Sequence, residues 1–329
     1  MLFDYYIAVD WSARSKPSSK KPASDALWVG ERALNSYGQK ETYFRTRFEC
    51  VEYLLEVLRN NIRAGFRTLI GYDLDFGFPA GFATALDLSG DDPPWRKIWT
   101  LLVERIEDDS TNLNNRFEVA STLNALCMGD EQMAFGPLWG CPVDREYSHL
   151  RPKKPGYPFL TKNGILLRDK RWTEHRESQA QPVWKLIGSA SVGGQTLLGI
   201  PAISKLRYHR DLRDFSQIWP FETGFIVPSN PYQAPSVLHV EIWPGLISSE
   251  LDSKIEIKDR AQVRATVNWL LRHDQGNTLR DLFNPPNWLS NEQIEDSVNE
   301  EGWVLGSGLS IPKSQQHQFT DSQPPLFDF

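Results

Sequence analysis

The sequence is short of the features that mark several common classes of protein. Only three of its 329 residues are cysteine, and Cys50, Cys127 and Cys141 lie far apart. An odd, widely spaced set of cysteines provides neither a disulfide framework nor a zinc pattern, so we expect a reducing compartment and a cytoplasmic protein. No stretch approaches the roughly 20 apolar residues of a membrane span, and no signal peptide or membrane association is expected.

An excess of positive charge is also missing. The chain has 36 Lys and Arg against 42 Asp and Glu, which gives a formal net charge of −6. The protein as a whole does not attract nucleic acid, so any such contact needs a local basic surface. The six histidines are scattered, with no H-x-x-x-H and no nucleophile elbow, which argues against zinc and against Ser-His-Asp catalysis.

What is present is enough apolar surface for a packed core, with 40% hydrophobic residues including 12 Trp and 17 Phe. In the first part of the chain, apolar runs predict strands at 4–10, 26–29 and 41–44, spaced as in an antiparallel meander. Helical periodicity follows at 48–62, and a further strand at 67–73. The predicted order is therefore βββαβ, in an α/β protein.

Prolines interrupt the pattern after residue 77, and we predict a long insertion at about 78–235 that packs on the core. Two helices are expected within it, at 95–106 and 115–127.

The regular pattern resumes with a strand at 236–241. A helix from Asp259, taken as the N-cap, to His273 follows, and then a shorter helix at 291–300. We predict a single domain over residues 1–306 and a mobile tail at 307–329, which is rich in Ser, Gln and Pro.

Three of the predicted strands end in a carboxylate, at Asp10, Asp73 and Glu241. An acid at the carboxyl end of a strand lies at the rim of the sheet, where ligands and metals bind. A turn that needs an acceptor explains one such acid equally well, but three in one chain indicate a shared site. Carboxylates are hard oxygen ligands, so Mg²⁺ or Mn²⁺ is the predicted cofactor.

Further acids are candidates for the same site. Asp75 lies two residues after Asp73 and shares its face in an extended chain. Glu300 and Glu301 end the last predicted helix, where an acid is mildly unfavourable, and either is a candidate fourth carboxylate. Asp259 competes with them but is better explained as an N-cap. The predicted catalytic acids are Asp10, Asp73, Glu241 and Glu300, and the predicted metal ligands are Asp10, Asp73, Asp75, Glu241 and Glu301.

Two segments are candidates for phosphate or nucleic-acid contact. The Gly-rich segment 189–201 offers backbone amides to a phosphate, although a tight turn explains it about as well. The basic segment 151–171 interleaves cations with aromatic residues, as in proteins that contact phosphates and stack bases, although a solvated loop is an equal alternative. The predicted contacts are Lys185, Gly193, Gly194, Lys153, Lys154, Arg168 and Arg171.

The tail carries a possible docking peptide. Gln323, Leu326 and Phe327 form a Gln-x-x-Leu-Phe motif that resembles the peptide by which bacterial DNA-processing proteins bind the sliding clamp. The alternative is that these apolar side chains pack on the protein's own surface or on a second copy.

Over nearly its whole length, the chain resembles a bacterial family of predicted ribonuclease-H-like nucleases of unknown function, some of which are labelled molybdopterin or cobalamin biosynthesis accessory proteins. The segments that carry the resemblance are VDWSA (9–13), GYD (71–73), FGFPAG (76–81), LWGCP (138–142), SVGGQTLLGIP (191–201), WPFET (219–223), EIWP (241–244), KDRAQVR (258–264) and EEGW (300–303). The resemblance implies a ribonuclease-H-like mixed sheet. Asp75 stands where that family usually has a proline.

The expected function is a metal-dependent phosphodiester hydrolase, a nuclease with two divalent cations. A non-catalytic nucleic-acid or nucleotide-binding module with the same fold is the alternative. A phosphotransferase of the sugar-kinase and actin-like group is disfavoured, because Trp11, Ser12 and Ala13 follow the first strand without the glycines of a phosphate hairpin.

Overall fold

The computed structural model describes most of the chain. The described residues are 1–34, 38–128, 136–175, 179–188, 190–227 and 235–309. The predicted docking peptide at Gln323, Leu326 and Phe327 lies outside these ranges and stays a prediction. Within them, no helix has both the length and the apolar character that crossing a membrane requires.

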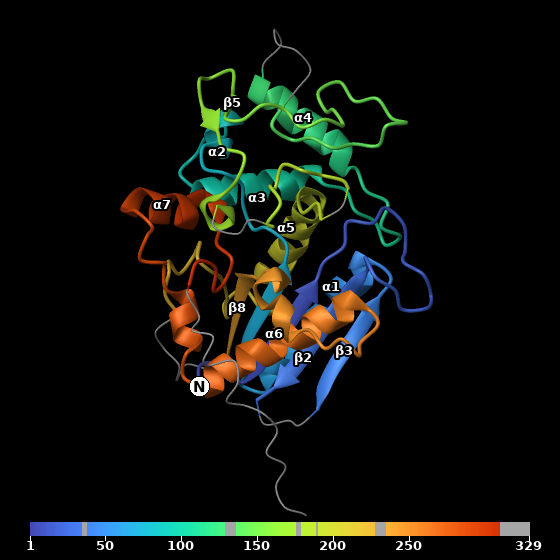
Figure 1. The fold of residues 1–329 in the computed structure, drawn as a ribbon, viewed down its shortest axis with the longest axis vertical. Coiled ribbons are helices and arrows are strands. Elements are labelled where there is room, and N and C mark those ends of the chain that lie inside the picture. The colour runs from blue at the N-terminus through green and yellow to red at the C-terminus, as the bar shows by residue number, and fades with distance from the viewer. Residues whose placement is uncertain (35–37, 129–135, 176–178, 189, 228–234, 310–329) are drawn as a thin grey trace, which may run out of the picture.

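A six-stranded mixed sheet forms the centre of the molecule (Figure 1). Its strands are β1 (Tyr5–Asp10), β2 (Leu27–Ala33), β3 (Gln39–Phe44), β4 (Arg67–Asp73), β7 (Ser216–Ile218) and β8 (Ser236–Glu241). The order across the sheet is β3-β2-β1-β4-β8-β7. The first three strands pair antiparallel, whereas β1, β4, β8 and β7 run parallel. The predicted α/β class, the meander and the βββαβ order are confirmed.

The central strands are apolar on both sides because both faces of the sheet are covered. Side chains alternate between faces along a strand, and they divide the core into two clusters. Ile7, Val9 and Tyr72 belong to one cluster, whereas Tyr6 and Ala8 belong to the other. The first cluster includes apolar residues of α1 (Arg47–Arg63) and α5 (Gly193–Arg207), and the second includes those of α6 (Lys258–Gln275).

In helix α1, the local sequence determines both where the helix begins and which face is buried. Thr46 caps its start by accepting a hydrogen bond from the backbone N of Glu49 at 3.2 Å. Cys50, Leu54 and Leu58 recur every four residues, so they share one buried face. This helix confirms the prediction at 48–62.

Much of the segment between β4 and β8 lies in the upper half of Figure 1, at the opposite end from the N-terminus, whereas its strand β7 belongs to the central sheet. Besides β7, its elements are α2 (Phe82–Ala85), α3 (Pro94–Arg105), α4 (Arg116–Met128), β5 (Phe159–Leu160), β6 (Leu166–Leu167), η1 (Trp172–Glu174) and α5. Helices α3 and α4 confirm the predictions at 95–106 and 115–127. The sequence pattern does not predict α5, which begins inside the Gly-rich segment.

The chain after β8 is helical. It contains η2 (Pro244–Glu250), α6, η3 (Leu279–Phe283), α7 (Asn291–Asp296) and η4 (Ser297–Glu301). The last two elements correspond to the predicted helix at 291–300.

Candidate functional site

Asp10, Asp73 and Glu241 end three neighbouring parallel strands, so they lie at the same edge of the sheet as predicted. The pairing register of the strands, however, places them on different faces of the sheet. Asp10 pairs with Asp73, whereas Glu241 pairs with Tyr72, one residue earlier. Paired residues project to the same face of a sheet, and successive residues project to opposite faces. Asp10 and Asp73 therefore share the face covered by α6, and Glu241 projects to the other face.

A third acid, Asp259, comes from α6 on the face that Asp10 and Asp73 share. Helix α6 begins at Lys258 with Ile257 as its N-cap, so the prediction that Asp259 is the N-cap is wrong. Asp259 is the second residue of the helix, and its Oδ2 lies 3.4 Å from the backbone N of Ala26. The sequence offers it only as a competitor for the fourth acid.

Burial and the charges of neighbouring acids raise the pKa values of Asp10 and Asp73. Burial raises the pKa of Asp10 well above its ordinary value, and the charges of Asp73 and Asp259 add to the effect. Burial, followed by the charge of Asp259 and then that of Glu241, raises the pKa of Asp73 to about 7. The exposed Lys258 acts in the opposite direction on both. A cluster of carboxylates with raised pKa values tends to bind either a proton or a cation.

The carboxylates of Asp10 and Asp73 have no hydrogen bond or ion pair with any other described residue. Only 8% of Asp10 is exposed and Asp73 is half-buried, so water does little to offset the two charges. Acids with so little exposure are ordinarily paired, which makes an unpaired couple of this kind a candidate for ligand binding.

Glu241 is fully engaged by Arg171. Its Oε1 accepts from Nη2 of Arg171 at 2.6 Å, and its Oε2 accepts from Nη1 at 2.9 Å. The backbone N of Phe76 also donates to Oε2, at 3.0 Å. Arg171 itself is 0% exposed, so it does not lie on the basic surface that is predicted for nucleic-acid contact.

Asp75 joins this second group through its Oδ1, which accepts from Arg171 at 2.7 Å. Its other oxygen, Oδ2, is buried without a partner among the described residues. Burial raises the pKa of Asp75 well above its ordinary value, although the charge of Arg171 opposes the shift. A small cavity of about 30 Å³ is lined by Asp73, Asp75, Arg171 and Glu241, so it connects the two groups of acids.

Glu300 and Glu301 bind backbone instead of lining that cavity. Glu300 accepts from the amides of Gly81 and Ala83 at 2.8 and 2.6 Å. Glu301 accepts from the amides of Ala80 and Trp172 at 2.8 and 2.7 Å. Burial raises the pKa of both to about 7. In this geometry, the two acids hold the loop that follows Asp75 and the segment that carries Arg171.

The predicted phosphate-binding glycines lie at the start of α5, against the segment 183–186. The amide of Gly193 donates to the backbone O of Lys185 at 3.0 Å. A Cβ on Gly193 would lie 2.0 Å from the backbone O of Val183, and one on Gly194 would lie 2.7 Å from that of Leu186. This close crossing explains why both positions are glycine, and phosphate contact by them stays a prediction.

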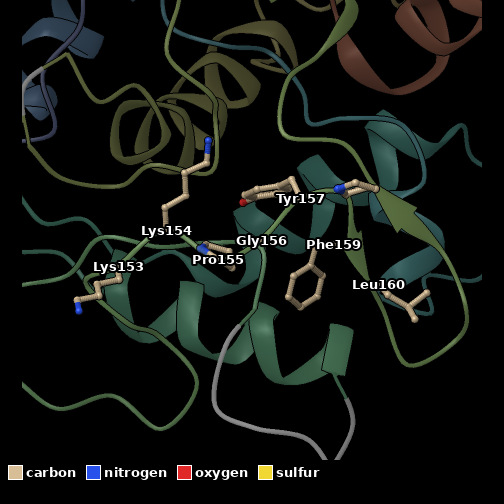
Figure 2. Close-up of a pocket in the computed structure, with 8 residues that line it drawn as sticks. Lys153, Lys154, Pro155, Gly156, Tyr157, Phe159 and Leu160 are labelled. Carbon is tan, nitrogen blue, oxygen red and sulfur yellow. The ribbon is translucent and has the colours of Figure 1, made fainter.

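Fewer cations of the basic segment 151–171 are exposed for contact with a ligand than the sequence predicts. Lys153 and Lys154 are exposed and line an open pocket of about 590 Å³ with Tyr157 and Phe159 (Figure 2). Lys154 bonds to Asp169 at 2.5 Å, and its Nζ lies 5.5 Å from the centre of the Tyr157 ring. Arg168 is half-buried and pairs with Glu301 and Asp296. The two lysines are thus the predicted cations of this segment best placed for a nucleic acid.

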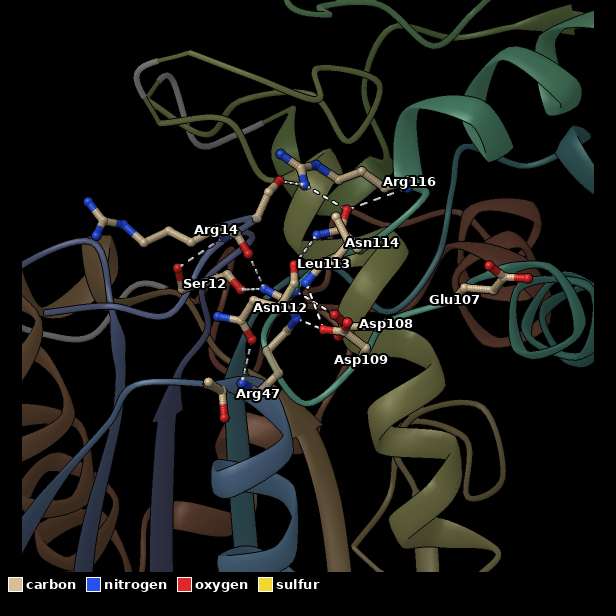
Figure 3. A network of polar contacts seen from close by, with 12 residues as sticks. Ser12, Arg14, Arg47, Glu107, Asp108, Asp109, Asn112, Leu113, Asn114 and Arg116 are labelled. Carbon is tan, nitrogen blue, oxygen red and sulfur yellow. Dashed lines mark hydrogen bonds and ion pairs between the residues drawn. The ribbon is translucent and has the colours of Figure 1, made fainter.

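The loop that leaves Asp10 is held by a buried arginine on α1 (Figure 3). Nη1 of Arg47 donates to the backbone O of Ser12 and of Arg14, at 2.9 and 2.8 Å. Its Nε and Nη2 donate to the two oxygens of Asp108, both at 2.6 Å. Because this arginine connects the loop to α1 and to the segment between α3 and α4, it restrains the backbone beside Asp10.

As the side chains stand, no three His, Cys, Asp or Glu residues in the described ranges form a group that could hold a metal ion. The chain matches no protein-family model. No significant similarity links it to a curated protein or to a solved structure.

Proposed function

We propose that the chain is a metal-dependent phosphodiester hydrolase whose divalent ion is held by Asp10, Asp73 and Asp259. The observation that carries the proposal is the pair formed by Asp10 and Asp73, which are in register, largely shielded from water and without a partner in the described chain. Two adjacent like charges in such a place are costly unless a proton or a cation offsets them. Mg²⁺ and Mn²⁺ suit this set of hard oxygen donors.

The sheet supports the same proposal. Three strands in an antiparallel meander, followed by two strands parallel to the first, support a ribonuclease-H-like fold for this sheet. This strand order agrees with the sequence resemblance. Under this proposal, the carboxyl edge of the central strands is the active site, as in other open α/β sheets.

In the proposed reaction, the ion and the residues of the chain have different roles. A bound divalent ion lowers the pKa of water and stabilises the charge that develops on a phosphate. Asp10, Asp73 and Asp259 would supply its ligands, which requires the three side chains to draw together around it. Lys258 is exposed beside all three acids and carries the charge needed to attract a phosphate oxygen.

The substrate is proposed to be a nucleic acid. Lys153 and Lys154 provide cations, and Tyr157 and Phe159 provide aromatic surface along the same open pocket. This combination of charge and aromatic surface suits the backbone and bases of a single strand.

The test is a cleavage assay on labelled single- and double-stranded DNA and RNA, with Mg²⁺, Mn²⁺ or EDTA. We expect metal-dependent cleavage that falls by about 100-fold or more in Asp10→Asn and in Asp73→Asn, because each removes an ion ligand. Asp25→Asn is the matched control, since Asp25 is an exposed acid beside Asp10 that is assigned no ligand role. Unchanged cleavage by a folded Asp10→Asn variant would refute the assignment.

A non-catalytic nucleic-acid-binding module is the second candidate. It is favoured by the internal bonds that occupy Glu241, Glu300 and Glu301, three of the acids predicted to act in catalysis or metal binding. Binding of a labelled oligonucleotide without cleavage under any of the metal conditions would support this alternative.

A further inference from the structure

We infer that Arg171 takes the place of the second cation, so that the protein binds a single divalent ion and holds Glu241 with a guanidinium instead. The inference rests on the proposed function. It departs from the two-cation expectation, in which Glu241 is a metal ligand.

All five N–H groups of Arg171 are used. Besides the two bonds to Glu241, Nε donates to Oε1 of Glu174 at 2.7 Å, and Nη2 donates to Oδ1 of Asp75 at 2.7 Å. Nη1 also donates to the backbone O of Glu301 at 2.9 Å. An arginine has five such donors, so the guanidinium is saturated by three carboxylates and one carbonyl. These are the oxygen ligands that a hard cation would otherwise take.

A metal ion does not fit beside this guanidinium. Both oxygens of Glu241 already accept hydrogen bonds, two from Arg171 and one from Phe76. An added divalent ion would lie against the buried positive charge of Arg171. Displacing that charge would leave it unpaired in the interior, at a cost that one carboxylate–metal bond does not offset.

The backbone that carries Arg171 is also held in place beside Glu241. Its backbone N donates to Oε2 of Glu174 at 3.2 Å, and the next amide, of Trp172, donates to Glu301 at 2.7 Å. The chain on which the guanidinium is mounted is therefore fixed at the same place, and the side chain cannot swing away as a mobile lysine would.

The register of the sheet explains how one edge accommodates two different cations. Asp10 and Asp73 project to the α6 face, where Asp259 lies, and Glu241 projects to the other face, where Arg171 lies. Asp73 pairs with Asp10 and also lines the small cavity with Asp75, Arg171 and Glu241, so it borders both groups. Because its donors are saturated, Arg171 acts through Glu241 and Asp75, and it is a positioning residue.

The experiment is a Mn²⁺ titration of the full chain, followed by isothermal calorimetry and by electron paramagnetic resonance. We expect one bound Mn²⁺ per chain and a spectrum without the spin coupling of two ions about 4 Å apart. Asp259→Asn should weaken binding by about tenfold or more. Its matched variant, Glu241→Gln, should keep one ion per chain and weaken binding less than Asp259→Asn does, because Glu241 acts on Asp73 only through its charge and is not itself an ion ligand.

The possible results separate the two proposals. Two coupled Mn²⁺ ions would overturn the role of Arg171 and leave the proposed function intact. A single ion whose binding is lost in Glu241→Gln but kept in Asp259→Asn would overturn the role of Arg171 and remove Asp259 from the proposed ligands, while metal-dependent hydrolysis would still stand. No Mn²⁺ binding at all would overturn both. If a variant does not fold, as judged by circular dichroism, the stoichiometry and the spectrum of the unaltered protein still show whether one or two ions bind.

Discussion

The carboxyl edge of the sheet carries two groups of acids that resemble each other in sequence and differ in their surroundings. Asp10 is buried and Asp73 half-buried, with no partner for either among the described residues. Asp75, Glu174 and Glu241 are buried around Arg171, and each gives it at least one oxygen. An acid at a strand end is therefore not by itself evidence of a functional site. What matters is whether the protein supplies the opposite charge.

The two groups should therefore respond to mutation in opposite directions. Removing the cation from the paired group leaves buried charges without compensation, and removing a carboxylate from the unpaired group relieves repulsion. Both effects are measurable as changes in the free energy of unfolding.

The largest expected effect comes from Arg171→Met. The substitution leaves three buried carboxylates without their cation, and we expect a loss of about 3–5 kcal/mol in the free energy of unfolding. Urea denaturation checks it. Lys170→Met, at the neighbouring cation, is the control and should change stability by about 0.5 kcal/mol or less. Equal effects of the two substitutions would remove the distinction between the groups.

A smaller effect of opposite sign is expected in the unpaired group. In EDTA at pH 8, Asp10→Asn should raise the free energy of unfolding by about 1–2 kcal/mol, because the charge beside Asp73 is gone. Glu241→Gln should lower it, since Arg171 then loses part of its compensation. Stabilisation by both substitutions, measured in the same urea titration, would contradict the division into paired and unpaired acids.

Stability should also depend on pH. The folded pKa values of Asp73, Glu300 and Glu301 are raised to about 7 from ordinary values near 4. Between these values the folded protein binds more protons than the unfolded chain, so stability falls as pH rises from about 4.5 to 7. Urea midpoints at pH 5, 6, 7 and 8 in EDTA test the slope.

Addition of Mn²⁺ should restore stability at pH 8 more than at pH 5, because protons compete with the ion for the same carboxylates. An equal effect of Mn²⁺ at both pH values would argue against binding at the unpaired acids.

The smallest effect concerns the open pocket of the basic segment. Lys153→Ala combined with Lys154→Ala should weaken oligonucleotide binding several-fold and reduce its salt dependence by about one to two phosphate contacts. Fluorescence anisotropy at several salt concentrations measures both. Lys205→Ala, at an exposed cation on α5, is the control. Similar losses in both proteins would indicate general attraction instead of a defined surface.

The strands, and the edge of the sheet at which the acids gather, could be predicted from the sequence, because apolar runs such as 4–10 and 67–73 end in Asp10 and Asp73. The face of the sheet to which each acid projects could not be predicted. Strands β1, β4 and β8 are apolar on both sides, so no alternation reveals that Glu241 is one residue out of step with Asp73.

Other misses have similar local causes. Asp259 satisfies the preference for an acid at an N-cap, yet the N-cap is Ile257, two residues earlier. Gly193, Gly194 and Pro201 lower helix propensity, and the contact with 183–186 that requires the glycines is not visible from sequence. Arg171 lies in a run of cations that is typical of a surface loop. Only its spacing of three residues from Glu174 hints at a local ion pair.

The most direct measurement is a crystal structure of the protein soaked in Mn²⁺, with the ion located by its anomalous scattering. We expect one ion, held by Asp10, Asp73 and Asp259, with Arg171 still bonded to both oxygens of Glu241. An ion bound to Glu241 in place of Arg171, or no ion among Asp10, Asp73 and Asp259 at saturating Mn²⁺, would contradict this assignment.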